Sequence, residues 1–123
     1  MFGETRTAAL LAKGIANDAS AFDAAYALQA ATLNGARALG LAERIGSIMP
    51  GKQADLAAVR LDALETQPMY NVISQLVYAT GRNQVSDVWI AGVRKLENGA
   101  LCAIDANALR DKARTWQARI AAH

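Results

Sequence analysis

The stretch IGSIMPGKQADLAAVRL, residues 45–61, decides how this chain is expected to fold. Residues 45–48 predict a short strand and the Pro-Gly pair at 50–51 predicts a turn. Residues 54–61 are mostly small or β-branched and predict a second strand. The sequence on either side of this stretch is therefore expected to change from helical to extended patterns.

The same stretch contains the spacing G-x-x-x-x-G-K of a phosphate-binding loop, from Gly46 to Lys52. The next position should be Ser or Thr, whose hydroxyl would hold a magnesium ion, and Gln53 cannot replace it. Such a loop also precedes a helix whose N-terminal amides face the phosphate, whereas a strand is expected from residue 54. We interpret the pattern as a turn between strands.

Upstream, residues 1–40 predict two helices. The first carries apolar residues at i, i+3, i+4 and i+7, namely Ala8, Leu11, Ala12 and Ile15. It should end near residues 17–18. Ser20, with Asp23 three residues on, is expected to begin the second helix, which should end at Gly40.

Downstream, apolar spacing over residues 72–80 predicts a short helix that ends at Gly81. Residues 85–91 and 93–96 then predict a hairpin with a turn at Ala91-Gly92, followed by an Asn-Gly turn signal. Asp105 is the expected N-cap of a last helix. Its apolar stripe consists of Leu109, Ala113, Trp116 and Ile120.

Composition bounds the class of protein. The 123 residues suffice for one domain, and 53% of them are hydrophobic, so disorder is not expected. Thirteen Lys and Arg against eleven Asp and Glu do not make the basic surface of a nucleic-acid-binding protein. The cations of the last helix are interpreted as a solvated face: Arg110, Lys112, Arg114 and Arg119.

No membrane or secretory segment is expected. The apolar run at residues 8–12 is interrupted by Lys13 before it reaches the ~7 residues of a signal core. No stretch approaches the ~18 apolar residues of a membrane span. Cys102 is the single cysteine and cannot form an internal disulfide, so we expect it to be buried in a protein of the reducing cytoplasm.

The inventory of chemical groups is small. The one histidine is His123, at the end of the chain, where a mobile surface residue is expected. A catalytic zinc usually takes three protein ligands from His, Cys and carboxylates at close spacing, and Ser74 and Ser86 have no histidine near them in sequence. The remaining candidates have structural interpretations: Asp55 as an acceptor for turn amides, Trp89 and Trp116 as core residues, and Arg82 as a helix-end contact. We assign no catalytic, cofactor-binding or metal-ligating residue to this chain.

Several segments together resemble the C-terminal signature of the amidohydrolase superfamily: ATLNGARALGL at 31–41, IGS at 45–47 and PGKQADL at 50–56. Two further segments resemble its branch of 5′-methylthioadenosine/S-adenosylhomocysteine deaminases and related chlorohydrolases: SQLVYATGR at 74–82 and VSDVWIAG at 85–92. Phe2-Gly3-Glu4 with Arg6 is similar to the segment that follows the last barrel ligands in that branch. Met49 and Asn71 depart from the acidic residues common at their positions.

The resemblance implies an α+β fold in three parts. Residues 1–40 would be the last helices of a (β/α)8 barrel, residues 41–104 the C-terminal half of a small β-sandwich, and residues 105–123 a closing helix. The ligands of the family's zinc or similar ion, an H-x-H pair with further histidines and an aspartate, would all lie upstream of Met1. The parent reaction would be hydrolytic deamination of an aminopurine-like or other aromatic amine by metal-bound hydroxide.

Two hypotheses of different class follow. The chain is a C-terminal fragment of a cytoplasmic amidohydrolase, inactive alone, whose partners are the missing N-terminal part or other copies that meet through exposed edges. Alternatively, it is a standalone, non-catalytic interaction module derived from that family, in which case the faces that the parent buries should have become polar. Leu10, Leu11 and Ile15 remain apolar. A small independent enzyme is a third and weaker interpretation.

Overall fold

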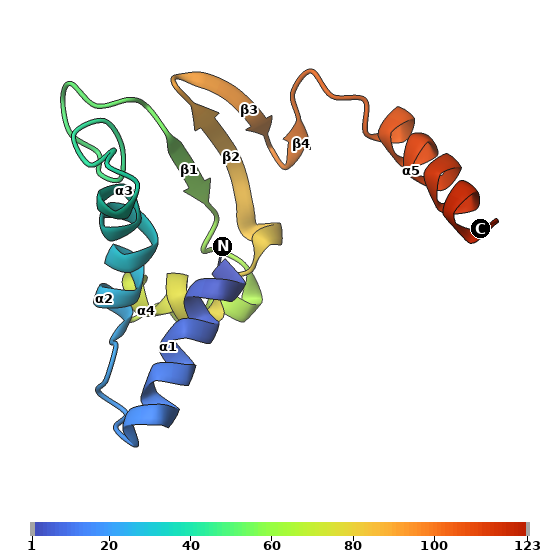
Figure 1. Ribbon diagram of the computed structural model, residues 1–123. Helices are drawn as coiled ribbons and strands as arrows, with labels where there is room; N and C mark the ends of the chain where they lie inside the picture. Colours follow the sequence, from blue (N-terminus) through green and yellow to red (C-terminus); the bar gives the residue numbers. More distant parts are fainter. Residues whose placement is uncertain (1, 123) are drawn as a thin grey trace.

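The computed structural model describes residues 2–122, in which helices precede a four-stranded sheet and a long helix follows it (Figure 1). Helix α1 spans Phe2–Ala16. Helix α2, Ala24–Gln29, continues through the π-helical segment η1, Ala30–Asn34, into α3, Gly35–Ala38. The two expected N-terminal helices are therefore present, the second with a π-helical centre.

The start of the second helix differs from the expectation. Asp23, and not Ser20, is the N-cap, because Asp23 Oδ1 accepts a hydrogen bond from the backbone N–H of Tyr26 at 2.8 Å. The Ser20 hydroxyl donates instead to Asp18 Oδ1, in the turn that leaves α1. At the other end Gly40 has a φ of +69°, as expected of the residue that follows a helix.

A second group of short helices lies between the first and second strands of the sheet. Its members are the 3₁₀ helix η2, Leu64–Thr66; α4, Val72–Ser74; the π-helical η3, Gln75–Ala79; and the 3₁₀ helix η4, Arg82–Gln84. Asn71 caps α4 by accepting from the amide of Ser74 at 2.9 Å. The helix expected at residues 72–80 is thus observed as α4 followed by η3.

The sheet is antiparallel throughout, with the order β1-β2-β3-β4. Its strands are β1, Leu56–Val59; β2, Val85–Ile90; β3, Val93–Glu97; and β4, Ala100–Leu101. Two-residue turns connect the last three strands, at Ala91-Gly92 and Asn98-Gly99, and both residues of each turn have positive φ. The hairpin was predicted, whereas β4 was not.

The strand expected at residues 45–48 does not exist. This segment is irregular, because Gly46 packs against the η1–α3 helical segment rather than pairing with a strand. A β-carbon at Gly46 would lie 2.7 Å from Ala36 Cβ and 3.1 Å from the Leu33 Cα. The second expected strand is present, shortened to β1.

The helical layer has a small core. Ala9, Ala27 and Val77 form its buried apolar centre, with Phe22 and Leu28 among the partly buried residues packed on it. Because two of the three central side chains are alanine, α1, α2 and η3 approach one another closely. Each side chain removes little apolar area from water, so the core of this layer contributes modestly to stability.

The two buried threonines of this layer, Thr66 and Thr80, are hydrogen-bonded. The Thr66 hydroxyl donates to the carbonyl of Ala63 at 2.8 Å, and the Thr80 hydroxyl donates to that of Gln75 at 3.1 Å. Gln75 Nε2 in turn donates to the Thr66 carbonyl at 2.6 Å. These bonds fix the irregular chain around α4 and η3, since an unpaired buried polar group would be costly.

The surface is unusually large for the mass. The accessible area is 8965 Å², whereas a compact protein of 13.0 kDa exposes roughly 6,300 Å². Exposed large apolar side chains occur on every layer, among them Leu10, Leu11, Ile15, Leu39, Ile48, Leu64 and Tyr70. The described residues therefore leave much apolar surface in contact with water.

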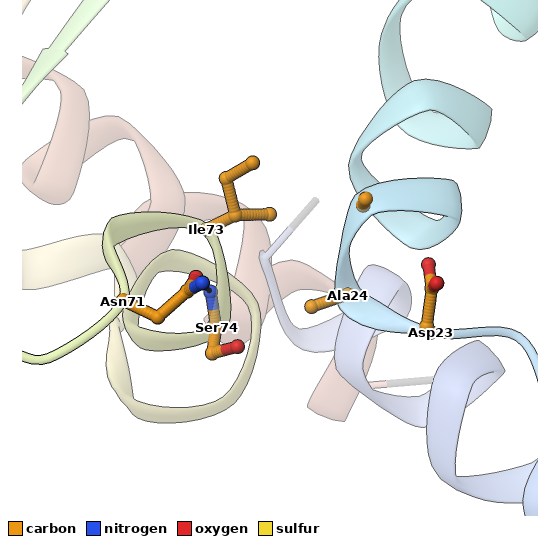
Figure 2. A pocket seen from close by; sticks show the side chains of 6 residues that line it. Asp23, Ala24, Asn71, Ile73 and Ser74 are labelled. Atoms are coloured by element: carbon orange, nitrogen blue, oxygen red, sulfur yellow. Dashed lines mark hydrogen bonds between the residues drawn. The ribbon is translucent and has the colours of Figure 1, made fainter. Parts of the chain in front are cut away.

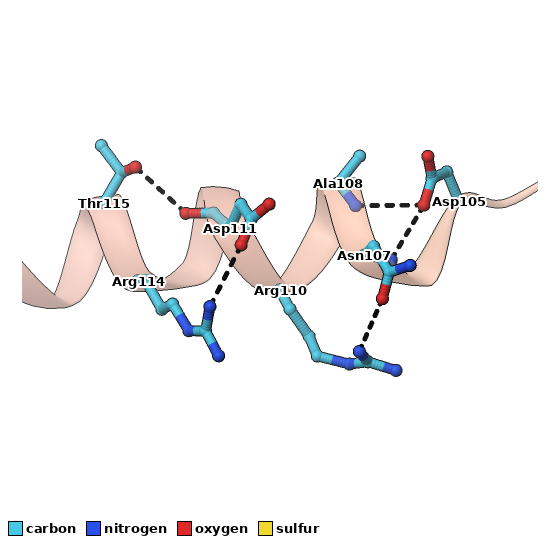
Figure 3. A network of polar contacts seen from close by, with 7 residues as sticks. All are labelled: Asp105, Asn107, Ala108, Arg110, Asp111, Arg114 and Thr115. Atoms are coloured by element: carbon cyan, nitrogen blue, oxygen red, sulfur yellow. Dashed lines mark hydrogen bonds and ion pairs between the residues drawn. The ribbon is translucent and has the colours of Figure 1, made fainter.

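Helix α5, Ala106–Ala121, lies apart from the helical layer, beyond β4 (Figure 1). Asp105 is its N-cap, as predicted, and accepts from the amides of Asn107 and Ala108 at 2.8 and 3.1 Å (Figure 3). The prediction that Trp116 belongs to a core is wrong for the described structure, because this side chain is 54% exposed. No helix within residues 2–122 has the length and apolar character needed to cross a membrane.

Candidate functional site

The residues that the structure describes hold no cluster of three or more His, Cys, Asp or Glu side chains that could bind a metal ion. His123 lies outside these residues, so its expected mobility stays a prediction. Cys102 is a free thiol and is partly buried. A zinc site cannot be assembled from the described part of this chain, because a catalytic zinc needs about three such ligands together.

The segment from Gly46 to Gln53 is a structural loop. Lys52, which would contact phosphate in a nucleotide-binding loop, donates instead to the carbonyls of Ala42 and Ile45, the latter at 3.4 Å. A strand follows the loop where a phosphate site requires a helix N-terminus. The prediction of a turn holds, with the correction that the loop joins a helix to β1 rather than two strands.

Asp55 has the role that the sequence predicted. Its Oδ1 accepts a hydrogen bond of 2.6 Å from the backbone N–H of Ala91, in the turn between β2 and β3. Beside it, the amide of Gly92 donates to the Ala54 carbonyl at 3.0 Å. Asp55 thereby fixes the entry of β1 against the β2–β3 turn.

The two serines considered as nucleophiles lie in structural positions. Ser86 Oγ donates to the carbonyl of Ala58 at 3.4 Å, which links β2 to β1. Ser74 lies in α4, where its amide donates to the Asn71 cap. Neither pairs with an imidazole within residues 2–122, because that part of the sequence contains none.

The hollow in Figure 2 has a volume of about 200 Å³ and lies between the first turns of α2 and α4. It is lined by Asp23, Ala24, Ala25, Asn71, Ile73 and Ser74. Two of its polar side chains are engaged, since Asp23 and Asn71 each cap their own helix. The hollow therefore lies between two capped helix starts.

One face of the sheet carries a charged and aromatic cluster. Trp89 lies opposite Arg94 in the β2–β3 pairing, with the guanidinium carbon 5.1 Å from the centre of the ring. Arg94 also forms ion pairs with Asp87, at 3.4 Å, and with Glu97. Trp89 is partly buried, and its exposed face is covered by a cation of this chain. These contacts stabilise the pairing of strands.

Arg6 makes the contact that the sequence assigned to Arg82. Its Nη2 donates to the carbonyl of Thr80 at 2.7 Å, and its Nε donates to that of Val77 at 3.3 Å. The guanidinium thus joins α1 to the C-terminal end of η3, where carbonyls lack helical partners. Arg82 begins η4 and is exposed. No local pattern could have identified Arg6, because its acceptors lie more than seventy residues away.

Electrostatic perturbation does not point to a reaction centre. The Ser20 hydroxyl, and next the Ser20 amide, donate to Asp18 and lower the pKa of that carboxyl below its usual value. The nearby Lys13 charge acts in the same direction. Asp18 is an exposed turn residue, so its lowered pKa reflects a local hydrogen-bonded turn.

The cations of α5 have partners on their own helix (Figure 3). Arg110 Nη1 donates to Asn107 Oδ1 at 2.7 Å, and Arg114 pairs with Asp111 at 3.3 Å. Both members of the second pair are largely exposed, so it contributes little to stability. The expectation of a solvated face is confirmed for these residues.

The helices and the antiparallel sheet of the described residues make an α+β unit. Residues 1–95 match the model of the Amidohydrolase family. The chain belongs to the amidohydrolase family, which confirms the resemblance drawn from its sequence motifs.

Curated relatives carry the name of the deaminase branch. The chain is 41% identical over 122 residues to a 5-methylthioadenosine/S-adenosylhomocysteine deaminase of Teredinibacter turnerae, covering 99% of this chain and 28% of the relative. It is 45% identical over 106 residues to the protein of the same name from Moorella thermoacetica, covering 86% of this chain and 25% of the relative. The chain thus spans about a quarter of these relatives.

Solved structures show the same fold. An adenosine deaminase from Xanthomonas campestris with bound zinc is 61% identical and superposes with a TM-score of 0.98, over 100% of this chain and 28% of that chain. The atrazine chlorohydrolase of Arthrobacter aurescens in complex with zinc is 23% identical, with a TM-score of 0.85 over 94% of this chain and 26% of that chain. The second likeness shows the fold alone.

Proposed function

We propose that this chain is the C-terminal part of a zinc-dependent deaminase that hydrolyses the C–N bond of an aminopurine-like or other aromatic amine. The observation that carries the proposal is the superposition on the zinc-bound adenosine deaminase, whose segment of the same shape is 61% identical. The curated relatives, which are named as deaminases of 5-methylthioadenosine and S-adenosylhomocysteine, support a purine nucleoside as the substrate.

In this proposal the chain is a scaffold with three parts. Residues 1–40 are the last helices of a barrel, residues 41–104 the C-terminal half of a β-sandwich, and residues 105–123 a closing helix. The observed change from helices to sheet between α3 and β1 supports the first boundary. Asp105, which caps α5, supports the second. A reducing cytoplasm, with the whole enzyme, is the compartment we propose.

Zinc in the whole enzyme would supply Lewis acidity for the hydrolysis, and the residues described here do not fit a zinc site. Its ligands and the groups that contact substrate would therefore belong to the rest of the enzyme. The chain's own residues hold backbone in place: Arg6 ties α1 to η3, Lys52 closes the loop before β1, and Asp55 fixes β1 to a turn. The chain alone is accordingly expected to be inactive.

The alternative, a standalone interaction module, predicts polar residues on faces that the enzyme would bury. Leu10, Leu11 and Ile15 of α1 are all more than half exposed and have remained apolar. An exposed apolar face of this kind is typical of a surface that is covered in the assembled protein. It therefore favours the enzyme interpretation.

The test is a covalent chimera, in which this chain replaces the matching segment of the Xanthomonas campestris deaminase. We expect the chimera to retain zinc and to release ammonia from adenosine or 5-methylthioadenosine, while this chain alone releases none. The parent enzyme and a version that lacks the segment are the controls. A chimera that folds and holds zinc but deaminates neither nucleoside would contradict the proposal, as would deamination by this chain alone.

A further inference from the structure

Helix α5 presents an apolar stripe to solvent. Each of its residues from Ala106 to Ala121 is exposed, including three large apolar side chains on one side: Leu109 at 57%, Trp116 at 54% and Ile120 at 72%. Ala113 lies between them on the same face. In Figure 1 the helix stands away from the other described elements.

A helix in this situation needs a packing partner. Its 16 residues are close to the ~12–15 below which an isolated helix is marginal in water, and most helical stability in proteins comes from burial of an apolar face. The Asp105 cap stabilises only the first turn. The stripe is therefore expected to be covered in the assembled protein.

The comparison with the Xanthomonas campestris deaminase places this helix. The superposition covers 100% of this chain with a TM-score of 0.98, so α5 stands in the same position in both. There the segment is 28% of a longer chain, and more than two thirds of the protein is available to cover it. The position of α5 thus belongs to an arrangement in which additional chain is present.

The sheet that leads into α5 also has an uncovered apolar face. Antiparallel register places Val88 opposite Leu96, Ile90 opposite Val93, and Leu96 opposite Leu101, so their side chains share one face. Those at Ile90, Val93 and Leu101 are about half exposed. We call this face, together with the α5 stripe, the distal surface.

The amount of exposed surface fits a large interface. The area above that of a compact protein of this mass is roughly 2,600 Å² on this chain alone, comparable with the upper end of the roughly 1,000–2,500 Å² that each partner of a permanent complex buries. The distal surface supplies part of it, and α1 supplies another part.

Charge argues against a second copy of α5 as the occupant. The stripe is flanked by Arg110 on one side and by Lys112 and Arg119 on the other, and Asp111 is the only acidic residue of the helix. In a symmetric dimer through this stripe, each cationic flank would meet flanks of the same sign. A partner with neutral or acidic groups around an apolar patch fits better.

We infer that the distal surface docks the N-terminal part of the same deaminase, and that the two parts assemble even when they are made as separate chains. This inference rests on the proposed function, because it takes its partner from there. The covalent link between the parts is then dispensable, since apolar contacts of the distal surface hold them together.

The experiment co-expresses this chain with the Xanthomonas campestris deaminase that lacks its matching segment, and measures co-elution in size-exclusion chromatography. The disruptive variant is Leu109→Asp with Ile120→Asp, which places two carboxylates on the stripe. The matched control is Thr115→Asp with Ala118→Asp, which adds the same charge to the opposite face. Because all four residues are exposed, these changes leave the folded body of this chain intact.

We expect the two parts to co-elute as one complex. The disruptive variant should lower the recovered complex by about tenfold or more, because a buried unpaired carboxylate is costly. The control should stay within about twofold of the unchanged pair. Co-elution that both variants leave unaltered would overturn the distal surface as the docking site, and absence of co-elution would overturn assembly in trans.

Three outcomes distinguish this inference from self-association of the chain and from the proposed function. A dimer of this chain alone that Leu109→Asp with Ile120→Asp dissolves, without any complex with the longer part, would assign the stripe to a second copy and overturn the inference. An active covalent chimera combined with no co-elution leaves the proposed function standing and defeats only the inference. Co-elution that depends on the stripe supports the docking whether or not the chimera is active.

Discussion

Among single residues, Gly46 combines a positive φ with close neighbours at the place of its missing β-carbon. Its φ of +88° lies in the left-handed region, and an added β-carbon would meet Ala36 Cβ at 2.7 Å and Thr32 O at 3.1 Å. Gly51, in the same loop, has a similar φ of +89°, but nothing lies within 4 Å of the place of its β-carbon. An alanine at either position would have a strained backbone, but only an alanine at Gly46 would also overlap with neighbouring atoms.

Gly46→Ala is expected to destabilise the covalent chimera by about 2–4 kcal/mol, since strain and overpacking add. Gly51→Ala should cost only about 1 kcal/mol, from backbone conformation alone. Thermal unfolding followed by circular dichroism gives both shifts. Equal midpoints for the two variants would show that the contact between Gly46 and Ala36 contributes nothing.

Residue roles could be predicted from sequence where the partner is close along the chain. The Asp105 cap and the Ala91-Gly92 turn are local, and both predictions are confirmed. Ser20 was wrongly taken as the cap in place of Asp23, because both types of side chain suit that position and only backbone geometry decides between them. Trp116 could not be placed, because an apolar stripe does not say what covers it.

At the scale of elements, α1 and η3 are joined chiefly by the Arg6 side chain and a few alanine contacts. The Arg6 guanidinium donates hydrogen bonds to two carbonyls at the end of η3, those of Val77 and Thr80. A cation also interacts favourably with the negative end of a helix. The Arg6 guanidinium therefore adds a polar link between the two helices to the apolar core of Ala9, Ala27 and Val77.

Arg6→Ala is expected to lower the stability of the chimera by about 2 kcal/mol, because two buried carbonyls lose a charged donor. Arg6→Lys should retain only part of this stability, since a lysine ammonium keeps the charge but cannot reproduce the planar set of N–H donors of the guanidinium. Arg82→Ala, at an exposed position next to the same helix end, should change stability by less than about 0.5 kcal/mol. Thermal midpoints check all three, and an effect at Arg82 as large as at Arg6 would reverse the assignment.

Elements were predicted well where periodicity extends over several turns or a turn signal is strong. The helices of residues 2–38, the β2–β3 hairpin and α5 belong to this group. The strand at residues 45–48 was predicted wrongly, because apolar residues around a glycine also suit a loop that packs on a helix. The π-helical segments η1 and η3 have the same residue types as α-helices, so propensity cannot separate them.

At the scale of the whole molecule, the main feature is uncovered apolar surface on α1, on the sheet and on α5. β1 also pairs only with β2 among the described strands, which leaves its other edge open. Both features favour association of the chain with another protein surface.

This chain, produced alone, is expected to self-associate and to bind a hydrophobic dye such as ANS. Size-exclusion chromatography with light scattering should show an average mass that rises with concentration across the micromolar range. Co-expression with the rest of the Xanthomonas campestris enzyme should reduce both dye binding and self-association. A monodisperse monomer that does not increase the fluorescence of the dye would favour the standalone module instead.

The two short turns of the sheet set the order in which the molecule is built. Strands β2, β3 and β4 are neighbours in sequence, joined at Ala91-Gly92 and Asn98-Gly99, and hairpins of this kind close within about 1–10 μs. β1 must cross the intervening helices before it pairs with β2. During synthesis, the three strands would thus pair within microseconds of leaving the ribosome, long before the next residues are added. Within the described residues, the slower step is then the pairing of β1 with this three-stranded meander, because the segment between β1 and β2 must first be brought together.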